Sequence, residues 1–257
     1  MHVVLITGAG RGIGLATARR FLAEGWRVAL LDIEAGLLDA AMAEIAQPEA
    51  TLALLCDVAD APALAAAIRR THAHFGRLDA LVNNAGTAVF KPMLETTAEE
   101  WARVLAVNLT APFLAVQAAA PLMAEGGGGA VVNITSISGL RASTLRVAYG
   151  TSKAALAHLT KQQAVELAGL GIRVNAVAPG PVDTAMAKAV HTPEIRRDYH
   201  DTIPLNRYGL ESELAETILF LCSDRASYLT GQVIAVDGGF EATGIGLPTL
   251  RAARRNI

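Results

Sequence analysis

Tyr149 and Lys153 are the residues whose types and spacing first suggest chemistry. They are four residues apart on a predicted helix, which places them on one face about one turn apart. A phenol has a reference pKa of about 10 and is a poor base at neutral pH, but a neighbouring ammonium group favours the phenolate. The pair predicts a general acid/base assisted by a lysine, although the same spacing also occurs by chance on surface helices.

A glycine-rich turn is the second candidate site, because the segment Thr7–Gly14 reads TGAGRGIG. Glycines let the backbone turn sharply, approach a pyrophosphate closely and pack the next helix against the strand. The N-terminus of that helix offers free N–H groups and the positive end of its dipole. Since the turn connects a predicted strand to a predicted helix, it predicts a dinucleotide-binding loop.

Asp32, at the end of the next predicted strand, has two interpretations. Its carboxylate could accept hydrogen bonds from an adenosine ribose and repel a 2′-phosphate, or it could cap the helix that follows. Arg11, inside the glycine-rich turn, could instead attract a 2′-phosphate. The position of Asp32 at the carboxyl end of a strand favours the ribose interpretation, so we expect NAD(H) rather than NADP(H).

The elements that must position these residues alternate between strands and helices. Strands are predicted over Val3–Thr7, Arg27–Asp32, Leu52–Cys56, Leu78–Asn83, Ala130–Ile134, Ile172–Val177 and Val233–Val236. Helices are predicted over Ile13–Glu24, Leu37–Ala46, Ala61–His74, Thr97–Ala124 (disturbed near Asn108 and Pro112), Val147–Ala168 and Glu213–Leu221. This alternation implies a doubly wound α/β sheet of parallel strands joined by right-handed crossovers. No shift in composition marks a second domain, so we expect one domain over residues 1–257.

The composition argues against several other kinds of protein. A net charge of −2 gives no electrostatic footprint for nucleic acid or for an anionic membrane. The uncharged segment Val104–Ala124 is long enough to span a bilayer, but its polar residues and prolines favour a buried helix. Two distant cysteines with no second ligand at metal-binding spacing predict neither a disulfide nor a metal site. A start without a basic region or cleavage site predicts no signal peptide and a cytoplasmic location.

Taken together, the motifs resemble those of the short-chain dehydrogenase/reductase family over nearly the whole chain. The matching segments are Thr7–Gly14, Asp57–Val58, Asn83–Gly86, Asn108, Ser136, Tyr149–Lys153 and Pro179–Gly180 with Thr184. The resemblance implies a Rossmann-type sheet of about seven strands with helices on both faces, assembled as a homotetramer or dimer, of which we expect the homotetramer.

The resemblance also implies a role for each matching residue. Tyr149 would be the general acid/base, and Ser136 would bind the substrate oxygen. Lys153 would bind the nicotinamide ribose and lower the pKa of Tyr149, while Asn108 would hold a water that links Lys153 to solvent. Ser136 could instead be an ordinary turn residue, Asn108 a helix irregularity and Thr184 a helix cap.

The cofactor site implied by these motifs includes residues from the whole chain. Asp57 and Val58 would face the adenine, and Thr184 would contact the carboxamide. The full expected set is Gly8, Arg11, Gly12, Ile13, Gly14, Asp32, Asp57, Val58, Asn84, Ala85, Gly86, Tyr149, Lys153, Pro179, Gly180, Val182 and Thr184.

The substrate is less constrained by the sequence. Residues 185–208 resemble the family's substrate lid, and residues 241–257 form a C-terminal tail. The polar lid residues are His191, Arg196, Arg197 and His200, which favour a polyol, a sugar or a small hydroxy acid, unless they face water. Arg141 and Arg146, before Tyr149, could bind an anionic or hydroxyl-rich substrate, or point outward or bridge subunits.

The expected reaction is the NAD(H)-dependent interconversion of a secondary alcohol and its carbonyl compound by hydride transfer. One alternative is an NADPH-dependent 3-oxoacyl thioester reductase of the same family. A second alternative is a nucleotide-binding regulator without catalysis. A degenerate active site would mark that regulator, whereas Asn108, Ser136, Tyr149 and Lys153 are all present.

Overall fold

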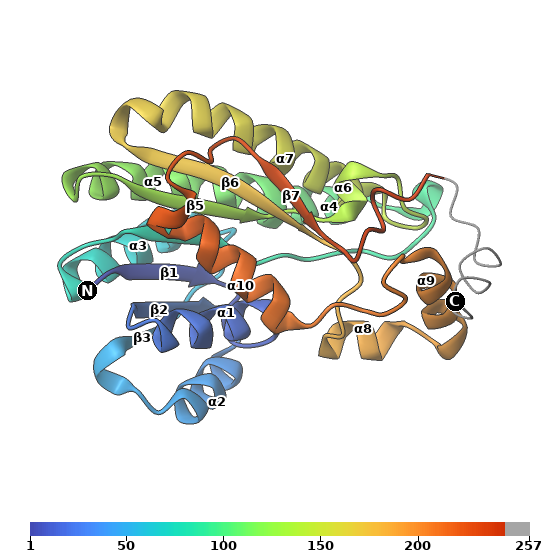
Figure 1. Cartoon of the computed structure of the whole chain (residues 1–257), viewed down its shortest axis with the longest axis horizontal. Coiled ribbons are helices and arrows are strands. Elements are labelled where there is room, and N and C mark those ends of the chain that lie inside the picture. The colour runs from blue at the N-terminus through green and yellow to red at the C-terminus, as the bar shows by residue number, and fades with distance from the viewer. Residues whose placement is uncertain (245–257) are drawn as a thin grey trace, which may run out of the picture.

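One parallel sheet forms the centre of the molecule (Figure 1). The computed structural model describes residues 1–244, apart from the side chains of Ala185, Met186 and Ala189. Seven strands lie in the order β3-β2-β1-β4-β5-β6-β7, each pair parallel. The strands are β1 (Val3–Thr7), β2 (Arg27–Asp32), β3 (Thr51–Leu55), β4 (Ala80–Asn83), β5 (Gly129–Ile134), β6 (Ile172–Pro179) and β7 (Val233–Val236). The predicted doubly wound sheet and its seven strands are confirmed, with shifts of one or two residues at several strand ends.

The strands are apolar along their length because helices cover both faces of the sheet. All five residues of β1 are buried. Leu5 belongs to the core on one face, whereas Val4 and Ile6 belong to the core on the other. This alternation is the geometry of a β-strand, whose successive side chains point to opposite faces.

The helices form one layer on each face (Figure 1). On the Val4 face lie α1 (Gly12–Ala23), α2 (Ala35–Ile45) and α10 (Glu211–Cys222). On the Leu5 face lie α3 (Ala61–Phe75), α5 (Ala111–Glu125) and α7 (Val147–Leu167), with α4 (Ala98–Leu105) leading into α5. The strand order reverses between β1 and β4, and loops that leave in opposite directions from such a point open a crevice at the carboxyl edge.

The long predicted helix is interrupted where the sequence indicated. A π-helical turn, Ala106–Thr110, separates α4 from α5 and contains Asn108. Within the described residues, Ala98–Glu125 is the one helical segment long and apolar enough to cross a membrane, and half of its most apolar window is buried inside the molecule. Ala115, Ala119 and Met123 form part of the core beside the sheet, as in the core helix of a folded domain.

Three short helices were not predicted: α6 (Ile137–Leu140), α8 (Ala185–Val190) and α9 (Pro193–Thr202). Each begins after a serine or threonine whose hydroxyl accepts a backbone N–H, namely Ser136, Thr184 and Thr192. The last two helices occupy the predicted lid. The predicted tail lies outside the described residues from residue 245 onward.

Candidate functional site

A cleft of about 530 Å³ lies at the carboxyl edge of the sheet, where the strand order reverses. Loops after the first six strands line it, together with residues of α8 and α9. Every residue predicted for the site lines this cleft except Gly14 and Asn108. The structure therefore brings together side chains that are far apart in the sequence.

The glycine-rich loop has the geometry that its composition predicts. Gly8 and Gly12 have φ angles of 64° and 61°, in the left-handed region that favours glycine. A Cβ atom on Gly14 would lie 2.1 Å from the Gly8 carbonyl oxygen, so glycine is required for α1 to begin this close to the loop. Arg11 precedes the helix, and no described side chain caps it. The first backbone N–H groups of α1 are therefore available to a phosphate.

Asp32 faces the glycine-rich loop from the end of β2. Its carboxylate accepts the backbone N–H groups of Gly10, at 2.9 Å, and Glu34, at 3.2 Å. The N-cap position of α2 is occupied by Glu34, and the Asp32 carboxylate accepts no N–H of the helix itself, so the interpretation of Asp32 as a helix cap is wrong. Two backbone donors fix the carboxylate, and each of its oxygens keeps a second lone pair for another donor.

Two ion pairs that sequence reasoning missed lie at this end of the cleft. The Arg11 guanidinium is 3.2 Å from the Glu34 carboxylate, and the Arg103 guanidinium is 3.0 Å from that of Asp57. All four of these residues line the cleft. Arg103 comes from α4, so only the folded chain could reveal its pairing with the loop after β3. For Glu34 the sequence offers one signal, because the residue follows Asp32 by two positions in the loop after β2.

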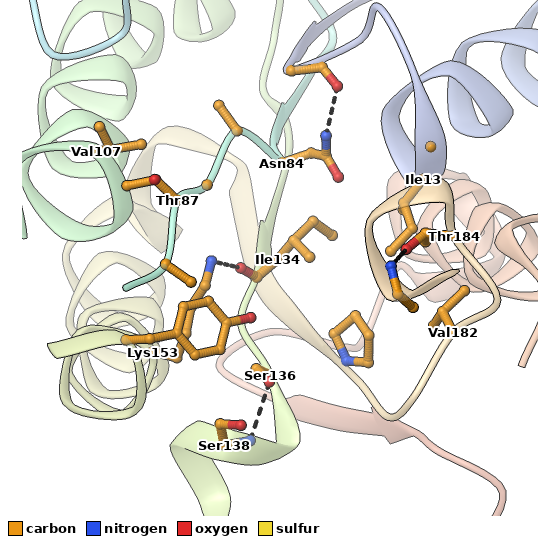
Figure 2. A pocket seen from close by; sticks show the side chains of 18 of the residues that line it. Ile13, Asn84, Thr87, Val107, Ile134, Ser136, Ser138, Lys153, Val182 and Thr184 are labelled. Atoms are coloured by element: carbon orange, nitrogen blue, oxygen red, sulfur yellow. Dashed lines mark hydrogen bonds between the residues drawn. The ribbon is translucent and has the colours of Figure 1, made fainter. Parts of the chain in front are cut away.

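The loop after β4 is tied directly to the glycine-rich loop. Asn84 donates from Nδ2 to the carbonyl oxygens of Thr7 and Gly8, at 2.9 Å each. The Thr7 hydroxyl accepts the backbone N–H groups of Asn84 and Ala85. Asn84 thus acts in the described structure as a brace between two loops of the cleft wall (Figure 2).

Ser136, Tyr149 and Lys153 converge at the other end of the cleft. Ser136 follows β5, and Tyr149 lies in the first turn of α7, one turn before Lys153. The Lys153 Nζ atom is 5.8 Å from the centre of the Tyr149 ring and donates to the Ile134 carbonyl at 2.7 Å (Figure 2). Among the described residues, that carbonyl is the one hydrogen-bond partner of the ammonium group.

Glycine allows these elements to approach each other. A Cβ atom on Gly139 would lie 2.6 Å from the backbone carbonyl carbon of Lys153. A Cβ atom on Gly150 would lie 3.0 Å from the Ser138 carbonyl oxygen. Because both positions lack a side chain, α6 packs directly on α7 and holds Ser136 beside Tyr149.

Burial dominates the electrostatics of the pair. Burial raises the pKa of Tyr149, while a hydrogen bond with Ser136 and the charge of Arg146 act in the opposite direction. Burial also lowers the pKa of Lys153 to about 8. Both shifts disfavour the charged form, as expected in a site with little water. The predicted lowering of the Tyr149 pKa by Lys153 is therefore not achieved by the protein's own groups, and the phenol stays protonated at neutral pH.

Asn108 lies behind the cleft wall and is fully buried. Its Nδ2 atom donates to the Thr87 carbonyl at 2.9 Å and to the Ser152 hydroxyl at 3.0 Å, and its Oδ1 atom accepts the Thr87 N–H. Both amide protons are therefore committed. A Cβ atom on Gly86 would lie 3.5 Å from both Asn108 Oδ1 and Lys153 Nζ, so these two groups approach each other across Gly86.

The lid contributes less polar surface to the cleft than its sequence suggested. Of the four polar lid residues, only His191 lines the cleft. Arg196 is paired with Asp183 at 3.0 Å, outside the cleft wall. The Thr184 hydroxyl accepts the Ala187 N–H as the cap of α8, and the residue also lines the cleft, where its contact with the carboxamide stays a prediction.

The two arginines before Tyr149 differ in position. Arg146 lines the cleft, and its guanidinium lies 5.1 Å from the centre of the Phe90 ring. Arg141 is not among the residues that form the wall. Phe90 and Tyr199 also line the cleft. Tyr199 lies within the predicted lid, and Phe90 lies in the loop after Gly86, which the sequence also predicts to contact the substrate.

Comparison with known proteins agrees with this geometry. Residues 8–241 match a family model described as enoyl-(acyl carrier protein) reductase. Galactitol 2-dehydrogenase (L-tagatose-forming) from Cereibacter sphaeroides is 43% identical, over 91% of this chain and 93% of the relative. The 3-oxoacyl-(acyl-carrier-protein) reductase FabG of Thermotoga maritima is 40% identical, over 92% and 96%. A short-chain type dehydrogenase/reductase from Mycobacterium ulcerans superposes with a TM-score of 0.91 at 33% identity, over 94% of this chain and 90% of that one.

The fold, the cleft and these similarities define an oxidoreductase of the class that uses a nicotinamide cofactor. More particularly, the chain belongs to the short-chain dehydrogenase/reductase family, as its motifs predicted.

Proposed function

We propose that the protein is an NAD(H)-dependent dehydrogenase/reductase that interconverts a small polar secondary alcohol and its carbonyl compound. The observation that carries the proposal is the convergence of Ser136, Tyr149 and Lys153 at one end of a cleft that begins at a glycine-rich loop. The galactitol dehydrogenase among the relatives, which acts on a polyol, supports the substrate class.

The residues present fit a dinucleotide. The uncapped N-terminus of α1 would hold the pyrophosphate, and Asp32 would accept the adenosine ribose hydroxyls. Lys153 has donor protons left after its bond to Ile134, and they would hold the nicotinamide ribose. A bound nicotinamide supplies the acceptor or donor of the hydride. The other residues of the expected cofactor set line the cleft between these points, apart from Gly14, which shapes the loop.

The charges around Asp32 support NAD(H) over NADP(H). A 2′-phosphate would lie near the carboxylates of Asp32 and Glu34, both of which line this end of the cleft. Arg11 is the cation that could have attracted that phosphate, but it is already paired with Glu34. The same charges disfavour the alternative of an NADPH-dependent 3-oxoacyl thioester reductase, although one relative is named a 3-oxoacyl-(acyl-carrier-protein) reductase.

The proton chemistry is assigned to the protein's own groups. Ser136 would bind the substrate oxygen, and in reduction the protonated Tyr149 phenol would donate its proton to that oxygen. In oxidation Tyr149 would first release this proton towards Lys153 and the water at Asn108, and the phenolate would then take the alcohol proton. The charge of Lys153 would stabilise the Tyr149 phenolate. The Lys153 Nζ atom lies 5.8 Å from the centre of the ring, and the charge attraction over this distance is strong because Lys153 is screened from water. Asn108 would accept a hydrogen bond from a water that links Lys153 to solvent, since both of its amide protons are committed.

The test is a screen of dinucleotide reduction over secondary alcohols, polyols, sugars and hydroxy acids. Tyr149→Phe should lose at least about 100-fold in turnover on the best substrate, with the dissociation constant for NADH unchanged. Tyr228→Phe, at a fully exposed tyrosine, is the matched control and should behave as wild type. More than about a tenth of wild-type activity in Tyr149→Phe would contradict the assigned role.

Cofactor preference is measured on the same substrate with both dinucleotides. Wild type should have the higher kcat/KM with NAD(H), and Asp32→Ala should weaken NAD(H) and narrow the difference. A higher kcat/KM of the wild type with NADP(H) would overturn this part of the proposal.

A further inference from the structure

The wall of the cleft is divided by charge. Its acidic side chains are Asp32, Glu34 and Asp57, which all lie at the ends of β2 and β3. No acidic residue lies among the described lining residues at the Tyr149 end. That end contains Lys153, Arg146 and His191.

Arg146 differs from the other cationic residues of the wall in having no local acceptor. Arg11 and Arg103 are paired with carboxylates, and Lys153 donates to a backbone carbonyl. Within residues 1–244, Arg146 has neither an ion-pair partner nor a side-chain hydrogen bond, and its guanidinium rests over Phe90. Residues 245–257 contain no aspartate or glutamate that could pair with it. Among the described residues, a planar fork of N–H donors is thus left unpaired in the wall of the cleft.

The backbone before α7 holds Arg146 in this place. Leu145 has a φ angle of 60°, a left-handed conformation that a large side chain rarely adopts. The Leu145 carbonyl accepts the Lys91 N–H at 3.2 Å, and the Arg146 carbonyl accepts the Gly150 N–H at 2.7 Å. Arg146 is therefore fixed at the N-terminus of α7, where the helix dipole disfavours a cation and favours a bound anion beside it.

His191 extends the same surface from the lid. Its Nδ1 atom lies 3.0 Å from the Tyr208 hydroxyl, and its ring lies 5.3 Å from that of Tyr199, centre to centre. The Nε2 atom has no partner among the described residues. Burial lowers the pKa of His191, and the charges of Arg146 and Arg196 lower it further, so Arg146 acts on the same region of the cleft. A neutral imidazole that accepts from Tyr208 would present an Nε2–H donor.

We propose that Arg146 and His191 form an oxyanion-binding subsite beside Tyr149, so that the physiological substrate is a secondary alcohol or ketone that also carries a carboxylate, sulfonate or phosphate group. This inference rests on the proposed function, because it assigns the second recognition element of the same substrate. The charged group of the substrate would occupy the Arg146 fork while Ser136 and Tyr149 hold the reacting oxygen.

The experiment compares matched alcohols that differ in one group. 3-Hydroxybutyrate, 2-hydroxypropane-1-sulfonate and 2-hydroxypropyl phosphate are the three anionic probes, and 3-hydroxybutyramide is the neutral one. Wild type should have a higher kcat/KM for at least one anionic probe than for the amide. Comparison of the three anionic probes then shows whether the subsite prefers a carboxylate, a sulfonate or a phosphate. Arg146→Gln should raise KM for that probe by about 10- to 100-fold, with an at least tenfold smaller change for the amide.

Further variants separate charge, geometry and mere disturbance of the loop. Arg146→Lys keeps the charge without the fork and should recover only part of the loss. His191→Asn should raise KM by about 3- to 10-fold, since one neutral hydrogen bond is removed. Arg141→Gln, in the same loop but outside the cleft wall, is the matched control and should equal wild type.

A binding measurement keeps the subsite and the reaction distinguishable. Calorimetric titration of the same probes into the protein with NADH should show anion binding that Arg146→Gln weakens. If no alcohol of any charge is oxidised while this binding persists, the proposed function fails and the subsite stands. Equal losses on anionic and neutral probes, an amide preferred over all three anions, or anion binding that Arg146→Gln leaves unchanged would overturn the subsite.

Discussion

At the scale of residues, burial decides the properties of the Tyr149–Lys153 pair. The spacing of the two residues was enough to predict a shared helix face, and the structure places both in the cleft wall. Their pKa values could not be predicted from spacing, because the desolvation of each group depends on what the fold packs around it. Lys153 is 3% exposed, and the free-energy cost of removing its ammonium group from water cannot be read from the sequence.

Lys153 makes the stability of the protein depend on pH in a defined direction. Its pKa falls from 10.5 to about 8 on folding, so between these values the unfolded chain binds more protons and stability rises with pH. The shift corresponds to a destabilisation of about 3 kcal/mol, which is fully present below pH 8 and absent above the unfolded pKa. In Lys153→Met this dependence should vanish. The wild-type free energy of unfolding minus that of Lys153→Met should therefore increase by about 3 kcal/mol from pH 7 to pH 10.5, as urea unfolding can measure.

The control is Lys161→Met, at an exposed lysine of the same helix, whose difference from wild type should stay flat over this range. A flat difference for Lys153→Met as well would show that the ammonium group is not desolvated. Activity gives no substitute readout here, since the substitution also removes a group of the proposed catalytic machinery.

At the scale of elements, predictability followed the length and pattern of each segment. The strands were predictable because each is an apolar run bounded by polar residues, and α7 because its length exceeds that of any strand. The helices α6 and α8 were missed because they are short, and α9 because its mostly polar sequence shows no apolar stripe. Ser136, Thr184 and Thr192 each precede one of them, and a search for capping hydroxyls would have been the available signal.

The site was predictable to the extent that its motifs sit at strand ends. Motif residues such as Asp32 and Thr184 reach the cleft because the carboxyl ends of parallel strands meet at one edge. The pairing of Arg103 with Asp57 was not predictable, because it depends on where α4 crosses the loop after β3. The same holds for the acceptor of Lys153, which is a backbone carbonyl of β5.

The end of α2 offers a test of how local geometry sets stability. Ala46 ends this helix at φ 51° and ψ 37°, a left-handed conformation, and its side chain is exposed. That conformation costs an L-residue about 1–2 kcal/mol, whereas glycine adopts it freely but gains more entropy in the unfolded chain. Ala46→Gly should therefore increase the free energy of unfolding by about 1 kcal/mol and raise Tm by roughly 2–4 °C.

The matched control is Ala43→Gly, at an exposed helical position of α2. Glycine there should lower stability by about 1 kcal/mol, because the helical conformation gives it no compensating advantage. A decrease of similar size for both variants would mean that the left-handed conformation at Ala46 is not maintained in solution.

At the scale of the whole molecule, the face formed by α5 and α7 bears on assembly. The inner residues of α5 pack into the core, while Phe113 on α5 is 46% exposed and Val165 on α7 is 80% exposed. Large apolar side chains on the outer surface of two neighbouring helices favour burial against another copy of the chain. This supports the prediction that the protein is a homotetramer, or at least a dimer.

The assembly prediction can be tested by the mass of the protein in solution. Light scattering at micromolar concentration should give about four times the 26.8 kDa of one chain. Phe113→Glu and Val165→Glu should each shift the population towards smaller species, because burying an unpaired carboxylate at an interface is costly. Leu55→Glu places the same charge at an exposed leucine of the edge strand β3, away from this face, and should leave the mass unchanged. A stable wild-type monomer would refute the assembly, and full-size Phe113→Glu and Val165→Glu species would refute the assigned face.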